Sequence, residues 1–353
     1  MKTSSIIMAG GNGTRFWPMS RTKLPKQFLD LDGKGTLINK TIERLTNTVE
    51  MDSLYIVGNK KHRSIFEDQL PKNFLMENLL LEPSARNTAP AIAASVMALH
   101  KKYGNHVVVV LPSDQHIKNE DNFTTQLQKA IQLAKSSHCV VTLGIKPTYP
   151  ATGYGYLNTN KISEDIFALS NFVEKPSYEL ALEYTQKDNY YWNAGIFVFE
   201  SGVMLNHISK HMPALYVQCE KIIDWNVDLQ SGKLEKLYEN MPSESIDYGV
   251  MEKIDSILMV PLDCGWSDLG SWDALNTIKS EDKDKNILEG NVQALDTQGT
   301  TIVAGKKLIA AIGLKDLIVV DTEDALLICY KDDVQKIKTL VGNLKQEGQG
   351  KLV

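Results

Sequence analysis

The sequence predicts an α/β fold with a mixed, mostly parallel sheet flanked by helices, followed by a small C-terminal domain of β strands. Over residues 1–145, short aliphatic runs alternate with longer amphipathic stretches, which is the pattern of parallel strands joined by crossover helices. A charged, poorly apolar stretch at 280–285 is typical of a linker. Only short strand-like runs follow it until the C-terminal helix.

The first half of the chain supplies the core strands and helices. Strands are expected where β-branched and aliphatic residues cluster, at 4–8, 54–57, 107–111 and 140–143. Helices are expected where apolar residues recur at helical spacing, at 37–48, 89–103 and 123–135. Right-handed crossovers through such helices place the strands in one Rossmann-like sheet, whose carboxyl edge is where ligands bind.

Residues 147–353 differ from the first half in composition and in their pattern of apolar residues. Glycine and aromatic residues are frequent over 147–199, which indicates mixed strands and loops at the carboxyl edge of the sheet. A small β domain is predicted by aliphatic runs at 292–295, 301–303, 308–312, 317–320 and 326–329. Apolar residues at helical spacing after Asp332 and Asp333 predict a C-terminal helix, and the tail after Gly348 is expected to fray. We therefore predict domains over 1–285 and 286–353.

Composition excludes several classes of protein. The chain has 353 residues with a net charge of -5, which argues against broad binding to nucleic acid or to anionic membranes. Its longest apolar runs are far shorter than the roughly 20 residues needed to span a bilayer. The four cysteines are isolated and lack the paired spacing of zinc sites, which favours reduced thiols and a cytoplasmic protein.

A glycine-rich loop directly follows the first predicted strand. Residues 9–18 read Ala-Gly-Gly-Asn-Gly-Thr-Arg-Phe-Trp-Pro, and residues 23–29 read Lys-Leu-Pro-Lys-Gln-Phe-Leu. Glycines let backbone amides turn toward an anion, and Arg15 and Lys26 add positive charge suited to a triphosphate. The loop lacks the spacing of a dinucleotide-binding fingerprint and the Gly-Lys-Ser/Thr ending of a Walker A loop. A simple tight turn is the alternative.

These residues resemble the signature of sugar nucleotidylyltransferases, and the Phe-Trp-Pro and Lys-Gln-Phe-Leu elements resemble the mannose-1-phosphate guanylyltransferase branch. Segments similar to later motifs of that family follow in the family's order, at 82–90, 111–116, 172–176, 192–195, 245–248 and 265–272. The resemblance covers nearly the whole chain. It implies a glycosyltransferase-A-like catalytic domain that converts GTP and mannose 1-phosphate into GDP-mannose and pyrophosphate.

This reaction joins anions that repel each other, so charge neutralisation must dominate catalysis. Mg²⁺ is the expected metal, because it binds phosphate oxygens with only one or two protein carboxylates. Asp114, at the end of a predicted strand, and Asp268 are the candidate ligands, although an Asx turn or a helix cap is the commoner role of a lone Asp in such a turn. Arg15 and Lys26 are the candidate catalytic cations, and His116 is expected to be structural.

The resemblance also assigns the two substrates. Gly10, Gly11, Gly13 and Thr14 are expected at the nucleotide, together with Asn87 and Ala89, which the family places near guanine. Asn87 is equally suited to cap the helix that follows it. The sugar phosphate is assigned to five residues that supply acceptors, donors, a cation and a close backbone approach: Gly153, Glu174, Lys175, Asn193 and Asp247. The aromatic residues nearby are expected to belong to the core.

The C-terminal domain resembles the shortened left-handed β-helix of these enzymes, which predicts a homodimer because an open solenoid end can be covered by a second subunit. Isomerase activity, found in longer relatives with a cupin domain, is not expected here. Two alternatives remain open. One is the same chemistry on another sugar 1-phosphate, such as a heptose, or another nucleotide. The other is a non-catalytic sensing module, against which the presence of all four charged candidates argues.

Overall fold

The structure is a computed structural model that describes residues 1–11 and 13–353. Asn12, in the glycine-rich loop, lies outside the described residues. Contacts within the chain divide it into two units. Unit 1 comprises residues 1–10, 41–113 and 119–264, and unit 2 comprises residues 11–40, 114–118 and 265–353. The two units are described in turn, and helix α1 (Leu37–Leu45) contributes residues to both.

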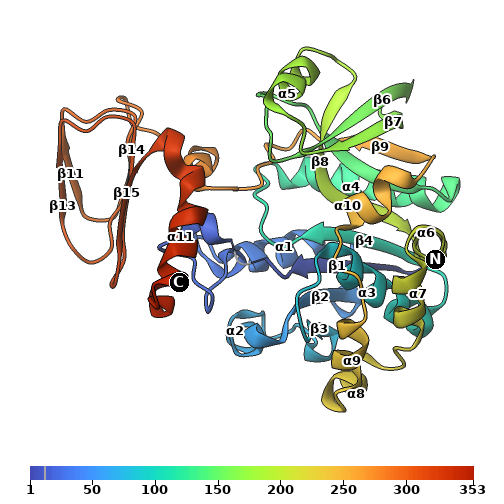
Figure 1. Cartoon of the computed structure of the whole chain (residues 1–353). Coiled ribbons are helices and arrows are strands. Elements are labelled where there is room, and N and C mark those ends of the chain that lie inside the picture. Colours follow the sequence, from blue (N-terminus) through green and yellow to red (C-terminus); the bar gives the residue numbers. More distant parts are fainter. Residues whose placement is uncertain (12) are drawn as a thin grey trace. The chain divides into compact units, whose positions relative to one another are not determined.

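Unit 1 is built on a nine-stranded mixed sheet of order β3-β2-β1-β4-β8-β5-β9-β7-β6 (Figure 1). Its strands are β1 (Thr3–Ala9), β2 (Leu54–Asn59), β3 (Leu79–Glu82), β4 (Val107–Pro112), β5 (Val140–Ile145), β6 (Gly155–Ser163), β7 (Ile166–Glu174), β8 (Tyr190–Glu200) and β9 (Ile257–Pro261). Strands β3, β2, β1 and β4 run parallel, whereas β8 runs antiparallel to β4, β5 and β6. The parallel part therefore presents the carboxyl ends of β1, β3 and β4 at one edge.

Helices cover this sheet. They are α2 (Arg63–Gln69), α3 (Thr88–Tyr103), α4 (Glu120–Ser137), α5 (Tyr178–Thr185), α6 (Ser201–His211), α7 (Pro213–Glu220), α8 (Trp225–Gln230), α9 (Lys233–Glu239) and α10 (Ile246–Gly249). Helix α3 packs against α6, α7 and α10, and its alanine-rich first half is fully buried in the main core cluster. Helix α4 packs against β4, β5, β8 and β9. No described helix is long and apolar enough to cross a membrane.

Unit 2 contains the loop from Gly11 to Lys40 and the C-terminal β domain. Two short 3-10 helices lie in the loop, at Thr14–Phe16 and Lys26–Phe28. The β domain consists of β10 (Ile287–Glu289), β11 (Val292–Leu295), β12 (Thr301–Val303), β13 (Ile309–Ile312), β14 (Leu317–Asp321) and β15 (Leu326–Tyr330). Strands β10, β12 and β14 stack in parallel, as do β11 and β13, and β15 closes the first sheet by pairing antiparallel with β14. This stacking gives the domain its β-helix-like form.

The end of the chain belongs to the core of unit 2. Helix α11 (Ile337–Gln346) follows a 3-10 turn at Lys331–Lys336, and it buries Ile337 and Val341 beside Phe16 and Trp17. Val353 is also buried there, and the Trp17 indole donates to the Leu352 carbonyl at 2.6 Å. The expectation that the tail frays is therefore wrong, because Trp17 supplies a partner that local sequence does not reveal.

The predicted fold class is confirmed: a mixed α/β nucleotidyltransferase fold is followed by a β-helix-like domain. The antiparallel share of the sheet is larger than its parallel first half suggests, because β8 inserts between β4 and β5. All four cysteines are free thiols. The boundary at residue 285 remains a prediction.

Candidate active site

In unit 2, Gly13 leaves room for the Lys26 side chain to pack against the backbone of the glycine loop. Gly13 has φ of +59°, and a Cβ atom there would lie 2.1 Å from the Cβ of Lys26, so any other residue would clash with the lysine. Lys26 begins the second 3-10 helix and has a side chain only 6% exposed. Glycine at position 13 is thus required by close packing as well as by backbone conformation.

The Lys26 ammonium connects two turns that are far apart in sequence. Its Nζ lies 3.0 Å from Asp114 Oδ2 and donates to the Asp268 carbonyl oxygen at 2.6 Å. The backbones of the same two turns are joined by an antiparallel bridge, in which His116 and Ser267 exchange hydrogen bonds of 2.8 and 3.0 Å. Lys26 is therefore brought together with the Asp114 carboxylate and the backbone of the Asp268 turn, and the roles of these residues stay predictions.

The two carboxylates differ in their surroundings. Asp114 remains 31% exposed and contacts Lys26. Asp268 Oδ1 accepts a hydrogen bond from Gly270 N at 3.0 Å, which is an Asx turn. Asp268 therefore forms the Asx turn that is the alternative interpretation of this residue. Whether its carboxylate also binds a metal ion stays a prediction.

The donor set suits a hard divalent cation. Among the described residues no group of three or more His, Cys, Asp and Glu side chains could hold a metal ion. Asp114 and Asp268 supply only oxygen donors, as Mg²⁺ prefers, and this ion commonly completes its shell with phosphate oxygens and water. Lys26 already binds Asp114, so a cation at this carboxylate would share it with the ammonium group.

The other loop residues are arranged around Lys26. Gly11 and Arg15 are exposed, and Thr14 is half-buried at the start of the first 3-10 helix. Ser20 Oγ donates to the Gly13 carbonyl at 2.8 Å and steadies the turn. Arg15 is therefore accessible to a ligand, whereas Lys26 is buried against the two acidic turns.

In unit 1, four of the predicted sugar residues form two hydrogen-bonded pairs, whose charges influence each other. Glu174, the last residue of β7, pairs with the Lys175 ammonium. Asn193 Nδ2 donates to Asp247 Oδ1 at 3.2 Å, and Asn193 Oδ1 accepts from Thr142 Oγ1 at 3.2 Å. Four of the five predicted sugar residues are thus brought together.

The electrostatics of this cluster are strongly perturbed. Burial, with the neighbouring charges of Glu174 and Glu252, raises the pKa of the Asp247 carboxyl to about 6. Burial alone would lower the pKa of Lys175, but its hydrogen bond to Glu174 and the charge of Asp247 raise it above the ordinary value. Perturbed ionisable groups of this kind are frequent at functional sites.

Gly153 precedes Tyr154, whose carbonyl accepts from Lys175 N at 3.2 Å, and the space around Gly153 is open. Nothing lies within 4 Å of where its Cβ would be, whereas a Cβ at Gly155 would lie 2.5 Å from Glu174 Oε2. Gly155 is thus the glycine that the cluster requires, and sequence reasoning missed it. It also missed Glu252, whose Oε1 accepts from Glu174 N at 3.3 Å. No local pattern marks Gly155, because its role depends on lying opposite Glu174 across β6 and β7.

The predicted guanine segment lies at the start of α3. Asn87 is exposed and caps the helix, because its side chain accepts from Thr88 N at 2.8 Å. Ala89 is fully buried, and its N–H donates to the Glu244 carbonyl at 3.0 Å. Thr88 Oγ1 accepts from Ile246 N at 2.9 Å. The start of α3 is therefore joined to α10, which carries Asp247.

Glu82 is a further residue that sequence reasoning left without a role. It ends β3 and is 5% exposed. A Cβ at Gly10 would lie 3.7 Å from Glu82 Oε2, so this carboxylate lies beside Gly10, just after β1. Its place directly after a buried strand, within segment 82–90, was the signal that could have found it.

The sheet order, the glycine loop after β1 and the acidic turn after β4 define a nucleotidyltransferase domain. A family model described as nucleotidyl transferase matches residues 4–285. A second, described as a mannose-phosphate isomerase/GMP-like β-helix domain, matches residues 290–344.

Individual relatives indicate which nucleotidyltransferases this chain is most similar to. A mannose-1-phosphate guanylyltransferase of Escherichia coli K12 is 39% identical over 358 residues, which cover 99% of this chain and 74% of the relative. A putative mannose-1-phosphate guanylyltransferase of Vibrio cholerae is 38% identical over 98% of this chain and 75% of the relative. A crystal structure from Thermus thermophilus, titled mannose-1-phosphate geranyltransferase, is 34% identical with a TM-score of 0.88, covering 98% of this chain and 100% of that chain. The chain belongs to the mannose-1-phosphate guanylyltransferase family, whose nucleotidyltransferases commonly use a divalent metal.

Proposed function

We propose that this protein transfers the guanylyl group of GTP to α-D-mannose 1-phosphate, giving GDP-mannose and pyrophosphate. The observation that carries the proposal is the buried Lys26 behind the glycine loop, held by the Asp114 turn and the Asp268 turn. The names of the relatives support this pair of substrates. Arg15 and Lys26 are the proposed catalytic cations.

The reaction needs no protein nucleophile. A phosphate monoester is already ionised near neutral pH, since its second pKa is about 6. A sugar phosphate oxygen attacks the α-phosphorus of GTP in line, while the bond to pyrophosphate breaks. Lys26 and the exposed Arg15 would stabilise the charge that moves onto pyrophosphate. Asp114 and Asp268 would hold Mg²⁺, which when bound neutralises phosphate charge.

The substrates are assigned to the clusters that their chemistry fits. We assign the nucleotide to Gly10, Gly11, Gly13 and Thr14, together with Asn87 and the backbone near Ala89. We assign the sugar 1-phosphate to Lys175 as the phosphate cation, and to Glu174, Asn193 and Asp247 as partners of hydroxyl groups. The open space at Gly153 supports a close approach of the sugar. A cytoplasmic location belongs to the same proposal, and the free cysteines support it.

Pyrophosphate release tests this function directly. With Mg²⁺ present, GTP, ATP, UTP and dTTP are each combined with mannose, glucose and heptose 1-phosphates. We expect release selectively from GTP with mannose 1-phosphate, because in-line attack requires both substrates to be bound together. A different preferred pair would keep the chemistry and replace the substrates. Absence of release from every pair would favour the sensing module.

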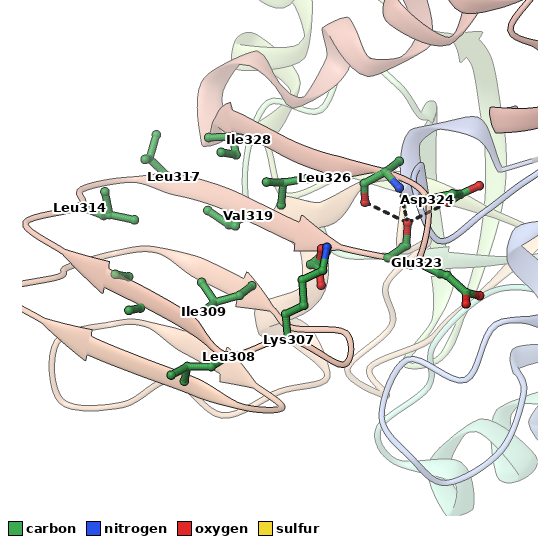
Figure 2. Close-up of a pocket in the computed structure, with 15 residues that line it drawn as sticks. Lys307, Leu308, Ile309, Leu314, Leu317, Val319, Glu323, Asp324, Leu326 and Ile328 are labelled. Atoms are coloured by element: carbon green, nitrogen blue, oxygen red, sulfur yellow. Dashed lines mark hydrogen bonds between the residues drawn. The ribbon is translucent and has the colours of Figure 1, made fainter.

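We also propose a homodimer formed through the β domain. Strand β15 lies at the edge of its sheet, and Leu326, Ile328 and Tyr330 on it are each more than half exposed. Beside it lies a groove of about 600 Å³. Figure 2 shows Leu326 and Ile328 on one side of this groove, Leu308 on the other, and Lys307, Glu323 and Asp324 at one end. This end of the groove carries both positive and negative side chains. Two copies can therefore pair about a two-fold axis, with Lys307 of each copy facing Glu323 and Asp324 of the other.

The oligomeric state tests this interface. Ile328→Lys should shift the protein from dimer to monomer in sedimentation equilibrium, because a charge in a buried apolar interface is strongly unfavourable. Ile162→Lys is the matched control, since Ile162 is 60% exposed on β6 of unit 1 and Ile328 is 59% exposed. A wild-type monomer at micromolar concentration, or a dimer that survives Ile328→Lys, would contradict the proposed interface.

A further inference from the structure

The C-terminal segment of unit 2 holds the glycine loop at Trp17. This residue lies two positions after the exposed Arg15 and is itself only 7% exposed. Its indole Nε1 donates to the Leu352 carbonyl at 2.6 Å, which satisfies the one polar atom of a buried side chain. The Trp17 ring belongs to the same core cluster as Val353 and the buried face of α11. The C-terminal segment therefore contacts the loop next to a candidate catalytic cation.

The backbone of Trp17 is joined to the Asp268 turn. The Trp17 carbonyl accepts from Nε1 of Trp272 at 2.9 Å, and Trp272 is 1% exposed. The rings of Trp272 and Phe16 have centroids 5.0 Å apart, and Lys26 Nζ lies 5.8 Å from the centroid of the Phe16 ring. Contacts from the C-terminal segment, from the Asp268 turn and from Lys26 thus converge on Phe16 and Trp17.

Arg21 forms a second attachment between the loop and the β domain. Its Nη2 atom donates to Asp324 Oδ1 at 2.7 Å, and Asp324 lies in the turn that joins β14 to β15 (Figure 2). Its Nη1 atom donates to the Pro18 carbonyl, and the guanidinium carbon lies 5.5 Å from the centroid of the Trp17 ring. The β domain therefore holds the loop through an ion pair as well as through the Trp17 indole.

These attachments determine where Arg15 lies. Phe16 N donates to the Gly13 carbonyl and Trp17 N donates to the Thr14 carbonyl, each at 3.1 Å, so the 3-10 turn shifts as one piece when Trp17 shifts. Arg15 is part of this turn, and its side chain is exposed. Misplacing a catalytic group by about 1 Å can cost about 100-fold in rate.

We propose that Trp17 and Arg21 are positioning residues, through which the C-terminal domain fixes the glycine loop and so controls the placement of Arg15 during nucleotidyl transfer. The kinetic consequence rests on the proposed function, in which Arg15 stabilises charge that moves onto pyrophosphate. The C-terminal domain thus has a role within each subunit, in addition to the proposed dimer interface.

Trp17→Phe tests the first attachment, because it keeps a buried ring and removes the indole donor. We expect kcat to fall about tenfold and the KM for GTP to change about twofold or less, since Arg15 acts on charge that develops in the transition state. In an Arg15→Gln background, Trp17→Phe should cause no further loss, because the group that it positions has been removed. Equal losses in the two backgrounds would contradict the proposed role.

Asp324→Asn tests the second attachment in a variant whose core is intact. We expect kcat to fall about threefold, the effect of losing a partly exposed ion pair, and Asp324→Glu should restore it, because glutamate keeps the charge that Arg21 binds. The double variant Arg21→Gln/Asp324→Asn should be no slower than Arg21→Gln alone. Additive losses would show that Asp324 acts through something other than Arg21, such as the dimer interface.

Asp333→Asn is the matched control. Asp333 pairs with Lys336 at 2.7 Å and its side chain is 43% exposed, whereas Asp324 pairs with Arg21 at 2.7 Å and is 47% exposed. The control breaks an ion pair of the same domain that does not reach the loop, so it should leave kcat unchanged. A loss equal to that of Asp324→Asn would overturn the inference.

Hydrogen exchange followed by mass spectrometry gives a readout that needs no substrate. The amides of Phe16, Met19 and Ser20 donate to carbonyls of the loop, so they should exchange slowly in the wild type. They should exchange severalfold faster in Trp17→Phe and in Asp324→Asn, because the loop opens more often when an attachment is lost. The control variant should exchange as the wild type does.

The outcomes distinguish this inference from the proposed function. Unchanged exchange and unchanged kcat in Trp17→Phe and Asp324→Asn, in a protein that uses GTP and mannose 1-phosphate, would overturn the inference alone. Faster exchange with unchanged kcat would also overturn it, since the loop would then be held without consequence for catalysis. A wild type that releases no pyrophosphate from any pair would overturn the proposed function, and the exchange of the loop would still decide whether the C-terminal domain holds it.

Discussion

Replacing Asp114 by asparagine should lower pyrophosphate release by about a thousandfold or more, which is the order of magnitude of losing one preorganised electrostatic group in an active site. Asp114 follows β4 and supplies one of two carboxylates on bridged turns. Asparagine keeps the shape and removes the charge that a divalent cation requires. Steady-state kinetics with GTP and mannose 1-phosphate measures the loss.

Metal binding without turnover provides an independent readout. Titration with Mn²⁺, followed by electron paramagnetic resonance, should show weaker binding to Asp114→Asn and to Asp268→Asn than to the wild type. Asp68→Asn, an exposed position on α2, is the matched control and should behave as the wild type. If Asp114→Asn or Asp268→Asn binds Mn²⁺ and turns over normally, that residue does not belong to the metal site.

Lys26→Met should also abolish most turnover. Unlike the aspartate variants, it should bind the metal ion more tightly than the wild type. The ammonium of Lys26 contacts Asp114 at 3.0 Å, so it competes with a cation for the same carboxylate. Methionine has a similar length and no charge, so Mn²⁺ binding to the nucleotide-free protein should tighten severalfold while turnover falls by about 100-fold or more. The variant should lose about 1–3 kcal/mol of unfolding free energy, because two turns lose their shared donor.

Lys23→Met is the control, since Lys23 is exposed in the same loop. It should change neither metal binding nor stability by more than the usual surface effect of about 0.5 kcal/mol. Weaker Mn²⁺ binding to Lys26→Met would contradict the competition and would assign Lys26 the role of holding the two turns in place. Chemical denaturation measures the stability of both variants.

The strands and helices of the first half were predictable because their patterns are local. Strand β4 was predicted within one residue of its observed end, and β11 and β12 were predicted with the observed bounds. Helices α6 to α9 were not predicted, since their apolar residues pack on several different elements: α6 and α7 on α3, α8 on β3, and α9 on α7 and α8. The position of β8 between β4 and β5, antiparallel to both, was not predicted either. The order and direction of strands depend on partners that lie elsewhere in the chain.

The sequence by itself determined the fold class, the family and the residue types of both candidate sites, because glycine loops, strand periodicity and motif order are properties of neighbouring residues. Only the tertiary structure decided how those residues are used. It placed Lys26 between Asp114 and Asp268, made Gly155 rather than Gly153 the glycine packed on Glu174, and left the buried carboxylate of Glu82 beside Gly10. The reason is physical: ion pairing, burial and close approach are set by distances in space, and no local pattern in the chain encodes them.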